Sequence, residues 1–138
     1  MKIRVIREKK QKLKQANMNK KRLLIIDDDS RNIFALENTL RARSFDCLSC
    51  LSAEEALKLL ETDEHIDAVL IDMMMPEMDG YEAIPLIKAI PSRKLTFVIA
   101  VTAQAMTGDK EKCLAAGADA YVSKPVDVDK LLQVLKEI

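Results

Sequence analysis

One aspartate in this chain stands where an apolar run stops abruptly. Residues 69–71 are Val, Leu and Ile, and Asp72 follows them directly. A short continuous apolar run is typical of a strand that is buried on both faces, and Pro76 and Gly80 predict a turn soon afterwards. Open α/β sheets bind their ligands beyond the carboxyl ends of the strands. Asp72 is therefore predicted to lie in such a site.

The other apolar runs also end in polar residues. Residues 23–26 are followed by an acidic stretch that begins with Asp27 and Asp28, Thr102 ends a later run, and Lys124 follows the last one. If these runs are parallel strands, all their carboxyl ends lie at one edge of the sheet. Several acids, one hydroxyl and one ammonium group would then converge there.

This combination of groups favours phosphoryl chemistry. Clustered carboxylates repel one another unless a cation lies among them, and oxygen ligands select a hard ion such as Mg²⁺, with Mn²⁺ as a substitute. Lys124 supplies a positive charge for a phosphate oxygen, and the hydroxyl of Thr102 donates to another. Asp72 is then placed to attack a phosphoryl donor and form an acyl phosphate.

An alternation of strand and helix signals places these residues. The predicted strands cover residues 23–27, 45–50, 67–72, 96–101 and 119–122. Short connections between alternating elements require parallel strands with right-handed crossover helices. We therefore expect an α/β fold with a doubly wound, five-stranded parallel sheet, (βα)5. Periodicity does not reveal the strand order, and the flavodoxin-like order is the natural expectation.

The helices carry their own signals. Ser52 and Glu55 form a capping-box pattern, and Gly117 occupies a C-terminal cap position. Apolar residues at helical spacing predict the first helix; they are Ile33, Phe34, Leu36 and Leu40.

The charge is divided between two parts of the chain. Residues 1–22 hold ten of the 22 basic residues and one of the 22 acidic residues, so they carry +9 and the remainder carries −9. We expect residues 1–21 to be a basic arm or linker, either helical or flexible, and residues 22–138 to be one acidic domain. Nucleic-acid binding by that domain is disfavoured. No apolar run reaches membrane-spanning length and no secretory signal is present, so we expect a cytoplasmic protein that is not inserted in a membrane.

The cysteine and histidine residues give no metal signal. Cys47 and Cys50 form a CxxC pattern, but the surrounding residues read as a strand, on which residues three apart point to opposite faces. The single histidine, His65, lies among acidic residues in a predicted loop. We expect buried structural cysteines, a solvated histidine and no zinc site.

At the polar strand ends, the chain resembles the receiver domain of two-component response regulators. The resemblance covers about residues 21–138. Asp27 and Asp28 match the family's acidic pair, and Asp72, shortly before Met-Pro-Glu-Met-Asp-Gly, matches its phosphoacceptor. Thr102 matches its hydroxyl residue, and Lys124, before a proline, its lysine.

The resemblance implies a ligand set for the metal. It assigns Mg²⁺ to Asp28, Asp72 and the backbone carbonyl of Met74, with Asp27 acting mainly through water, and it makes Asp72 the site of 4-aspartylphosphate. Asp29 is not counted as a ligand.

The resemblance also implies a switch. Thr102 and Tyr121 match the pair whose hydroxyl and ring move together, and small Ala103 leaves the phosphoryl group accessible. The Lys124–Pro125 peptide bond is expected to be cis. Met74 and Gln104 flank the path of the attacking water. Because a thioether cannot orient that water, we expect slow self-dephosphorylation.

These features favour a signalling switch over a metabolic enzyme. A histidine kinase or histidine phosphotransfer protein would donate to Asp72, and the chain would catalyse only its own phosphorylation and dephosphorylation. The readout would use the fourth helix, fifth strand and fifth helix, and act on a downstream protein target or attached kinase domains. The chain is either a stand-alone regulator or, slightly favoured, a module of a hybrid kinase.

Two other interpretations are weaker. An aspartyl-phosphate phosphatase or phosphotransferase is the alternative enzyme. Dehalogenase-type enzymes of that kind need an acid two residues after the nucleophile, where this chain has Met74, and no Gly-rich phosphate loop is present. A receiver-like scaffold that takes no phosphate is disfavoured because every site group is present.

Overall fold

The strands of the computed structural model lie close to their predicted positions. The structure describes residues 20–103 and 108–138. Its five strands form one sheet; they are β1 (Arg22–Ile26), β2 (Asp46–Cys50), β3 (Ala68–Asp72), β4 (Phe97–Thr102) and β5 (Ala120–Ser123). All strand pairs are parallel and their order is β2-β1-β3-β4-β5. The expected flavodoxin-like order is confirmed.

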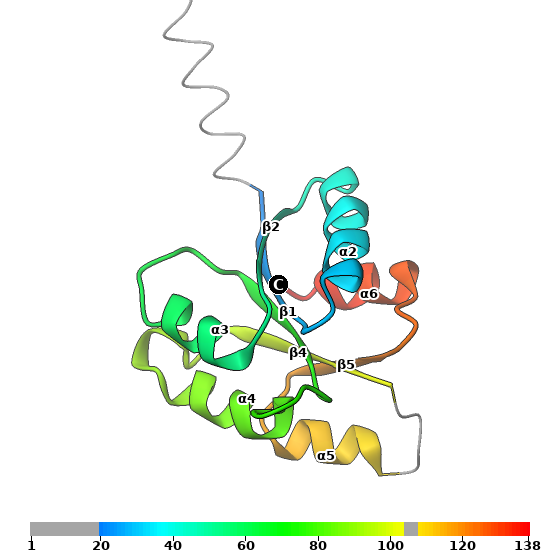
Figure 1. Ribbon diagram of the computed structural model, residues 1–138. Helices are drawn as coiled ribbons and strands as arrows, with labels where there is room; N and C mark the ends of the chain where they lie inside the picture. The colour runs from blue at the N-terminus through cyan, green and yellow to red at the C-terminus, as the bar shows by residue number, and fades with distance from the viewer. Residues whose placement is uncertain (1–19, 104–107) are drawn as a thin grey trace, which may run out of the picture.

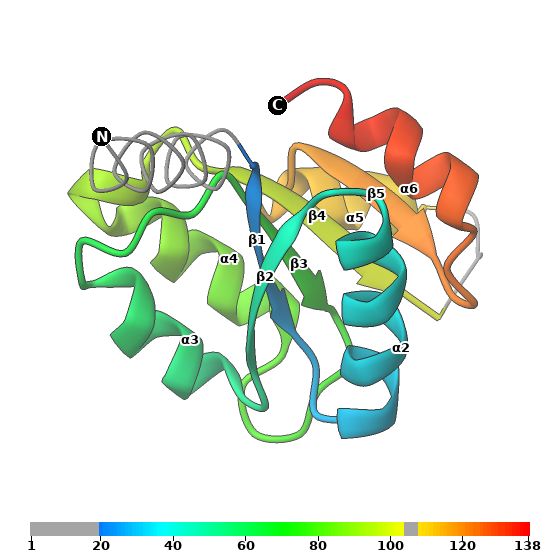
Figure 2. The same cartoon turned by 90° about the horizontal axis from the view of Figure 1, so that it is seen from above.

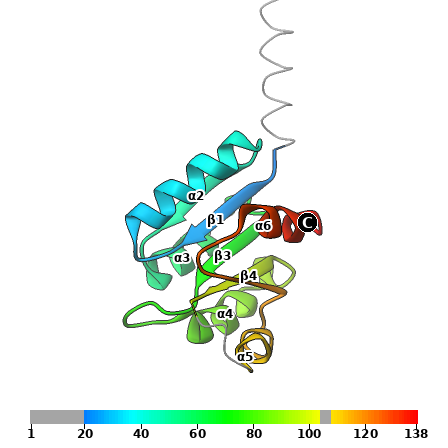
Figure 3. The same cartoon turned by 90° about the vertical axis from the view of Figure 1, so that its right-hand side faces the viewer.

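Helices cover both faces of this sheet, as a doubly wound fold requires. They are α2 (Ser30–Ala42), α3 (Ala53–Leu60), α4 (Gly80–Ala89), α5 (Asp109–Ala115) and α6 (Val128–Leu135), with a short 3-10 helix, η1, at Pro91–Arg93. Helices α2 and α6 lie on one face, and α3, α4 and α5 lie on the other (Figures 1 and 3). None of the helices in the described ranges is long and apolar enough to cross a membrane.

The two faces of the sheet have separate hydrophobic cores. Leu23 and Ile25 of β1 pack with residues of α2 and α6, whereas Leu24 and Ile26 pack with residues of α3, α4 and α5. All four side chains are at most 1% exposed. Continuous apolar runs therefore predicted the central strands because both strand faces are buried.

The CxxC cysteines are divided between these cores, as predicted. Cys47 packs in the core beneath α2 and α6, and Cys50 packs in the core beneath α3. Both thiols are free and buried, and burial raises the pKa of each. The two sulfur atoms lie on opposite sides of the sheet and are not placed for a shared metal or a disulfide.

Two predicted helix ends are found in the structure. At one of them, the start of α3, one hydrogen bond has a different donor from the one expected. Ser52 caps α3 by accepting from the backbone N–H of Glu55, but the carboxylate of Glu55 accepts from the N–H of Leu51 rather than of Ser52. The reciprocal half of the predicted capping box is thus displaced by one residue. Gly117, at φ +112°, follows α5 in the left-handed conformation that favours glycine.

One apolar residue of the first predicted helix does not face the core. Ile33 and Leu40 are buried, but Phe34 is 67% exposed. Helical spacing identified the helix correctly and assigned too broad an apolar face to it. The expected basic arm lies almost wholly outside the described residues.

Candidate functional site

The parallel register brings the predicted site residues to one edge of the sheet. Ile26 of β1 pairs with Ile71 of β3, so the next residues, Asp27 and Asp72, lie side by side. Figure 2 shows β1 and β3 running in the same direction toward this edge. Asp72 in turn pairs with Val101 of β4. The sheet itself therefore sets the spacing between the acids.

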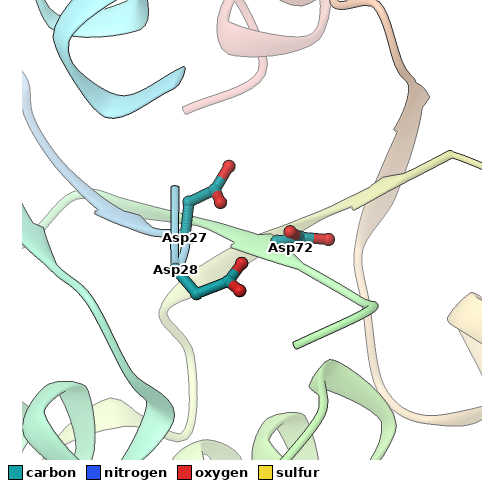
Figure 4. Close-up of side chains that lie close together, drawn as sticks. All are labelled: Asp27, Asp28 and Asp72. Atoms are coloured by element: carbon teal, nitrogen blue, oxygen red, sulfur yellow. The ribbon is translucent and has the colours of Figure 1, made fainter. Parts of the chain in front are cut away.

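Three carboxylates gather at this edge. One oxygen each from Asp27, Asp28 and Asp72 lies within 4.8 Å of the others (Figure 4). Asp27 and Asp72 are only 4% and 5% exposed, whereas Asp28 is exposed. Oxygen donors alone, with more than one negative charge, form a set that suits a hard divalent cation. The residues present therefore fit Mg²⁺, which Asp28 and Asp72 would contact.

Hydrogen bonds fix the direction of both buried carboxylates. Asp72 Oδ1 accepts from the backbone N–H of Met74 at 3.0 Å, and Asp72 Oδ2 accepts from Lys124 Nζ at 3.0 Å. Asp27 Oδ1 accepts from the backbone N–H of Asp29 at 2.9 Å. Both buried carboxylates are thus held in place by hydrogen bonds.

Lys124 is the positive group that faces the acids. Its Nζ lies 3.0 Å from Asp72 Oδ2 and 3.5 Å from Asp27 Oδ2. Burial lowers its pKa, but the hydrogen bond and charge of Asp72, together with Asp27, outweigh this and raise the pKa of Lys124 overall. The side chain therefore carries an ammonium charge across the neutral pH range.

The surroundings of Asp27 disfavour its negative charge. Burial raises its pKa, and the nearby charge of Asp72 acts in the same direction. The N–H of Asp29 and the ammonium of Lys124 offset part of this effect. A divalent cation would stabilise the charged form of Asp27 and so relieve the repulsion within the cluster.

The neighbouring strands β4 and β5 hold the hydroxyl and the aromatic ring. Thr102, the last residue of β4, is 1% exposed, and Tyr121 of β5 is half-buried against the core beneath α4 and α5. Thr102 pairs with Ser123 across the two strands, and its carbonyl accepts from the N–H of Lys124 at 2.7 Å. The ends of β4 and β5 are therefore connected next to the carboxylates.

The structure describes all but one of the other residues singled out at this edge. Asp29 caps α2 by accepting from Arg31, in agreement with its exclusion from the ligand set. The Lys124–Pro125 peptide bond is cis, as expected. Ala103 is exposed, and Gln104 lies outside the described residues.

The three methionines that follow Asp72 differ in exposure, and His65 lies apart from the acids. Met73 and Met75 are buried, whereas the Met74 side chain is 55% exposed at the rim of the site and does not belong to the core. His65 is exposed and pairs with Asp67 at 3.0 Å, away from the cluster. A role for His65 as a ligand is therefore not supported.

Sequence reasoning missed a cavity that opens beside the cluster. Its volume is about 390 Å³, and it lies between α2 and the segment that connects β5 to α6. Ala35, Leu36 and Val126 contribute to its apolar wall, and Asp72 and Lys124 line it at the site. Small and apolar residues on the inner face of α2 were its only signal in the sequence.

Comparison with known proteins agrees with this arrangement. The family model of the response regulator receiver domain matches residues 23–136. The polar-differentiation response regulator DivK of Brucella ovis is 33% identical over 116 residues, which cover 84% of this chain and 94% of DivK. The sensor histidine kinase RcsC of Escherichia coli is 39% identical over 114 residues, which cover 82% of this chain and 12% of the kinase.

Solved structures agree as well. A putative response regulator from Chloroflexus aurantiacus superposes with a TM-score of 0.81 at 30% identity, covering 86% of this chain and 97% of that one. The receiver domain of a sensor histidine kinase from Pseudomonas aeruginosa, with a magnesium ion coordinated in its active site cleft, has a TM-score of 0.78 at 30% identity and covers 86% and 96%. The sequence match, the sheet order and the acidic cluster beside a lysine lead to one assignment: this chain belongs to the response regulator receiver domain family.

Proposed function

We propose that Asp72 accepts a phosphoryl group and that the chain is a phosphorylation-controlled switch in a phosphorelay. The main support for this proposal is the hydrogen bond and ion pair between Lys124 and Asp72. An ammonium group bonded to a buried carboxylate, among acids that suit a divalent ion, places positive charge where a phosphoryl group would add negative charge. The donor is a histidine kinase or a histidine phosphotransfer protein.

The positions of the groups support the following reaction. Asp72 attacks phosphorus, and the new O–P bond forms as the N–P bond of phosphohistidine breaks. The donor leaves as neutral imidazole, which keeps the proton already on its other ring nitrogen. Bound Mg²⁺ would neutralise charge between the two anions, held by Asp28, Asp72 and the Met74 carbonyl, with Asp27 acting through water. Lys124 and Thr102 then contact the phosphoryl oxygens.

The switch itself uses the strand end that holds Thr102. Its hydroxyl moves toward the phosphoryl group, and the half-buried ring of Tyr121 follows inward. The readout face comprises α5, β5 and α6, which are the fourth helix, fifth strand and fifth helix of the alternating pattern. A downstream protein target or attached kinase domains read this face. The chain thus promotes only its own phosphorylation and dephosphorylation.

Enzymatic turnover through the same intermediate is a weaker candidate. A phosphatase of the dehalogenase type needs a proton donor two residues after the nucleophile, and Met74 has none to give. We therefore expect the phosphoryl group to stay on Asp72 until water removes it slowly.

The test is the intact mass of the protein after incubation with Mg²⁺ and acetyl phosphate. We expect one added phosphoryl group in the wild type, and none in Asp72→Asn or after chelation of the metal. Asp29→Asn is the matched control, because it changes an acid beside the cluster but keeps an oxygen to cap α2. Unchanged labelling of Asp72→Asn would refute the assignment.

A further inference from the structure

The sulfur atoms near the phosphoacceptor differ sharply in their access to solvent. Met73 and Met75 are 0% and 7% exposed, whereas Met74, between them, is 55% exposed. Met78 is half-buried. The thiols of Cys47, Cys50 and Cys113 are buried. Within residues 20–103 and 108–138, Met74 is thus the sulfur-bearing residue that is most accessible to an oxidant in solution.

The thiols are further protected because burial disfavours their ionisation to thiolates. Burial raises the pKa of the thiols of Cys47, Cys50 and Cys113 above the ordinary value. Oxidants attack thiolates rather than thiols, so these groups react slowly near neutral pH. A methionine thioether has no proton to lose, and its reactivity follows its exposure.

Met74 is also attached directly to the site. Its backbone N–H donates to Asp72 Oδ1 at 3.0 Å, so the main chain of Met74 is held against this carboxylate while its side chain is exposed. A change in the chemistry of this side chain would therefore act at the rim of the acidic cluster. Met73 and Met75, on either side, face the protein interior and would not.

We propose that Met74 is a reversible oxidation site and that its sulfoxide shortens the lifetime of the phosphoryl group on Asp72. A peroxide supplies the oxygen: the O–O bond breaks, an S=O bond forms, sulfur loses two electrons, and with hydrogen peroxide the product is water. Methionine sulfoxide reductases reverse such oxidation in general. The second half of the proposal rests on the proposed function.

The effect on lifetime follows from hydrogen bonding. A thioether is a weak acceptor and leaves nearby water unoriented. The sulfoxide oxygen is a strong acceptor and can hold a water molecule next to the phosphoryl group, as a carboxamide would. One such hydrogen bond corresponds to a rate increase of up to about tenfold.

The first experiment follows oxidation alone. The protein is treated with limiting hydrogen peroxide, digested, and its peptides are weighed over time. We expect the Met74 sulfur to gain oxygen well before those of Met73 and Met75. Equal or slower oxidation of Met74 would overturn the proposal, whatever the function of Asp72.

The second experiment measures the phosphoryl lifetime. Protein labelled with acetyl phosphate is freed of donor, and the decay of its intact mass is compared before and after peroxide treatment. We expect faster decay after oxidation, reversal by methionine sulfoxide reductase, and similarly fast decay in untreated Met74→Gln. An oxidised protein with an unchanged decay rate would overturn the regulatory half and leave phosphorylation of Asp72 intact.

The matched control is Met74→Leu, compared with its own untreated sample. Leucine keeps an apolar side chain and cannot be oxidised, and every other methionine of the chain remains. We expect peroxide to leave the decay rate of this variant unchanged. A response of the same size as in the wild type would assign the effect to another residue. Failure of the untreated wild type to take any label would refute the proposed function instead.

Discussion

The hydroxyl of Tyr81 donates a hydrogen bond of 3.0 Å to Asp109 Oδ1 and so joins the first turns of α4 and α5. Asp109 is 6% exposed, and its other oxygen, Oδ2, has no hydrogen-bond partner within the part of the chain that the structure describes. Burial and the bond to Asp109 raise the pKa of Tyr81. The tyrosine therefore remains a donor throughout the neutral pH range.

Removing this hydroxyl should destabilise the fold. In Tyr81→Phe, both oxygens of a buried carboxylate would lack a partner, and we expect the free energy of unfolding to fall by about 1–3 kcal/mol. Urea denaturation measures the change. Replacing the carboxylate as well, in Tyr81→Phe with Asp109→Leu, should recover most of the loss, because two apolar groups leave nothing unpaired. A double variant that is no more stable than Tyr81→Phe would contradict this account.

The pKa of Asp27 predicts how stability depends on pH without metal. Burial raises the pKa above the 3.8 of an exposed aspartate, so the folded protein binds this proton more readily than the unfolded chain. Metal-free stability should then fall as pH rises from about pH 4 through the raised pKa. Asp27→Asn removes the buried charge, and its amide oxygen can still accept from Asp29. Its melting temperature should exceed that of the wild type at pH 7.

Calorimetry in the presence of a chelator, between pH 4 and pH 8, checks this difference. The advantage of Asp27→Asn should shrink toward pH 4, where Asp27 of the wild type takes up its proton. Added Mg²⁺ should raise the melting temperature of the wild type more than that of the variant. If the melting-temperature advantage of Asp27→Asn grew toward low pH, this would contradict a raised pKa of Asp27 in the folded protein.

The strand ends could be predicted from the sequence because a parallel sheet leaves little freedom. Apolar runs covered on both faces identified β1 and β3, and parallel pairing then required Asp27 and Asp72 to be neighbours. The alternation of side chains along a strand likewise assigned Cys47 and Cys50 to opposite cores. In both cases local geometry sufficed.

Contacts between helices could not be predicted in the same way. Tyr81 and Asp109 are 28 residues apart on two different helices, and no period in the sequence fixes how those helices are rotated against each other. The exposure of Phe34 was missed for a related reason, because periodicity counts apolar residues and does not show which of them the sheet covers. The cavity beside the site depends on packing between α2 and the segment after β5, which also follows only from the assembled fold.

Gly80 at the start of α4 is predicted to be intolerant of a side chain. A Cβ atom there would collide with Met73 Sδ and lie 2.8 Å from Met73 Cα. The side chain of Met73 can move, but its backbone belongs to the segment that leaves β3 and carries the site. We expect Gly80→Ala to lower the free energy of unfolding by about 1–3 kcal/mol, measured by urea denaturation. Met73→Ala removes core packing of its own, so the test is the cost of Gly80→Ala within that background. We expect this cost to be smaller than in the wild type but not zero, because the contact with Cα remains; a cost of zero would show that the sulfur alone was responsible.

The affinities for the two proposed ligands, Mg²⁺ and a phosphoryl group, should respond in opposite directions to the loss of Lys124. Its ammonium lies 3.0 Å from Asp72 Oδ2, where it repels a divalent cation and attracts the anionic oxygens of a phosphoryl group. Lys124→Met keeps the apolar stem and removes the charge. We expect Mg²⁺ to bind several-fold more tightly, and beryllofluoride, as a phosphoryl analogue, to bind about tenfold to a hundredfold more weakly at saturating Mg²⁺.

Titration calorimetry for Mg²⁺ and fluorine NMR for beryllofluoride measure the two affinities separately. Lys88→Met is the matched control, because Lys88 pairs with Asp119 at 2.8 Å, outside the acidic cluster. That variant should leave both affinities near those of the wild type. A Lys124→Met protein in which both affinities fall together would indicate that the site had lost its shape. One in which neither affinity changes would show that the ammonium group does not act on the ligands of Asp72.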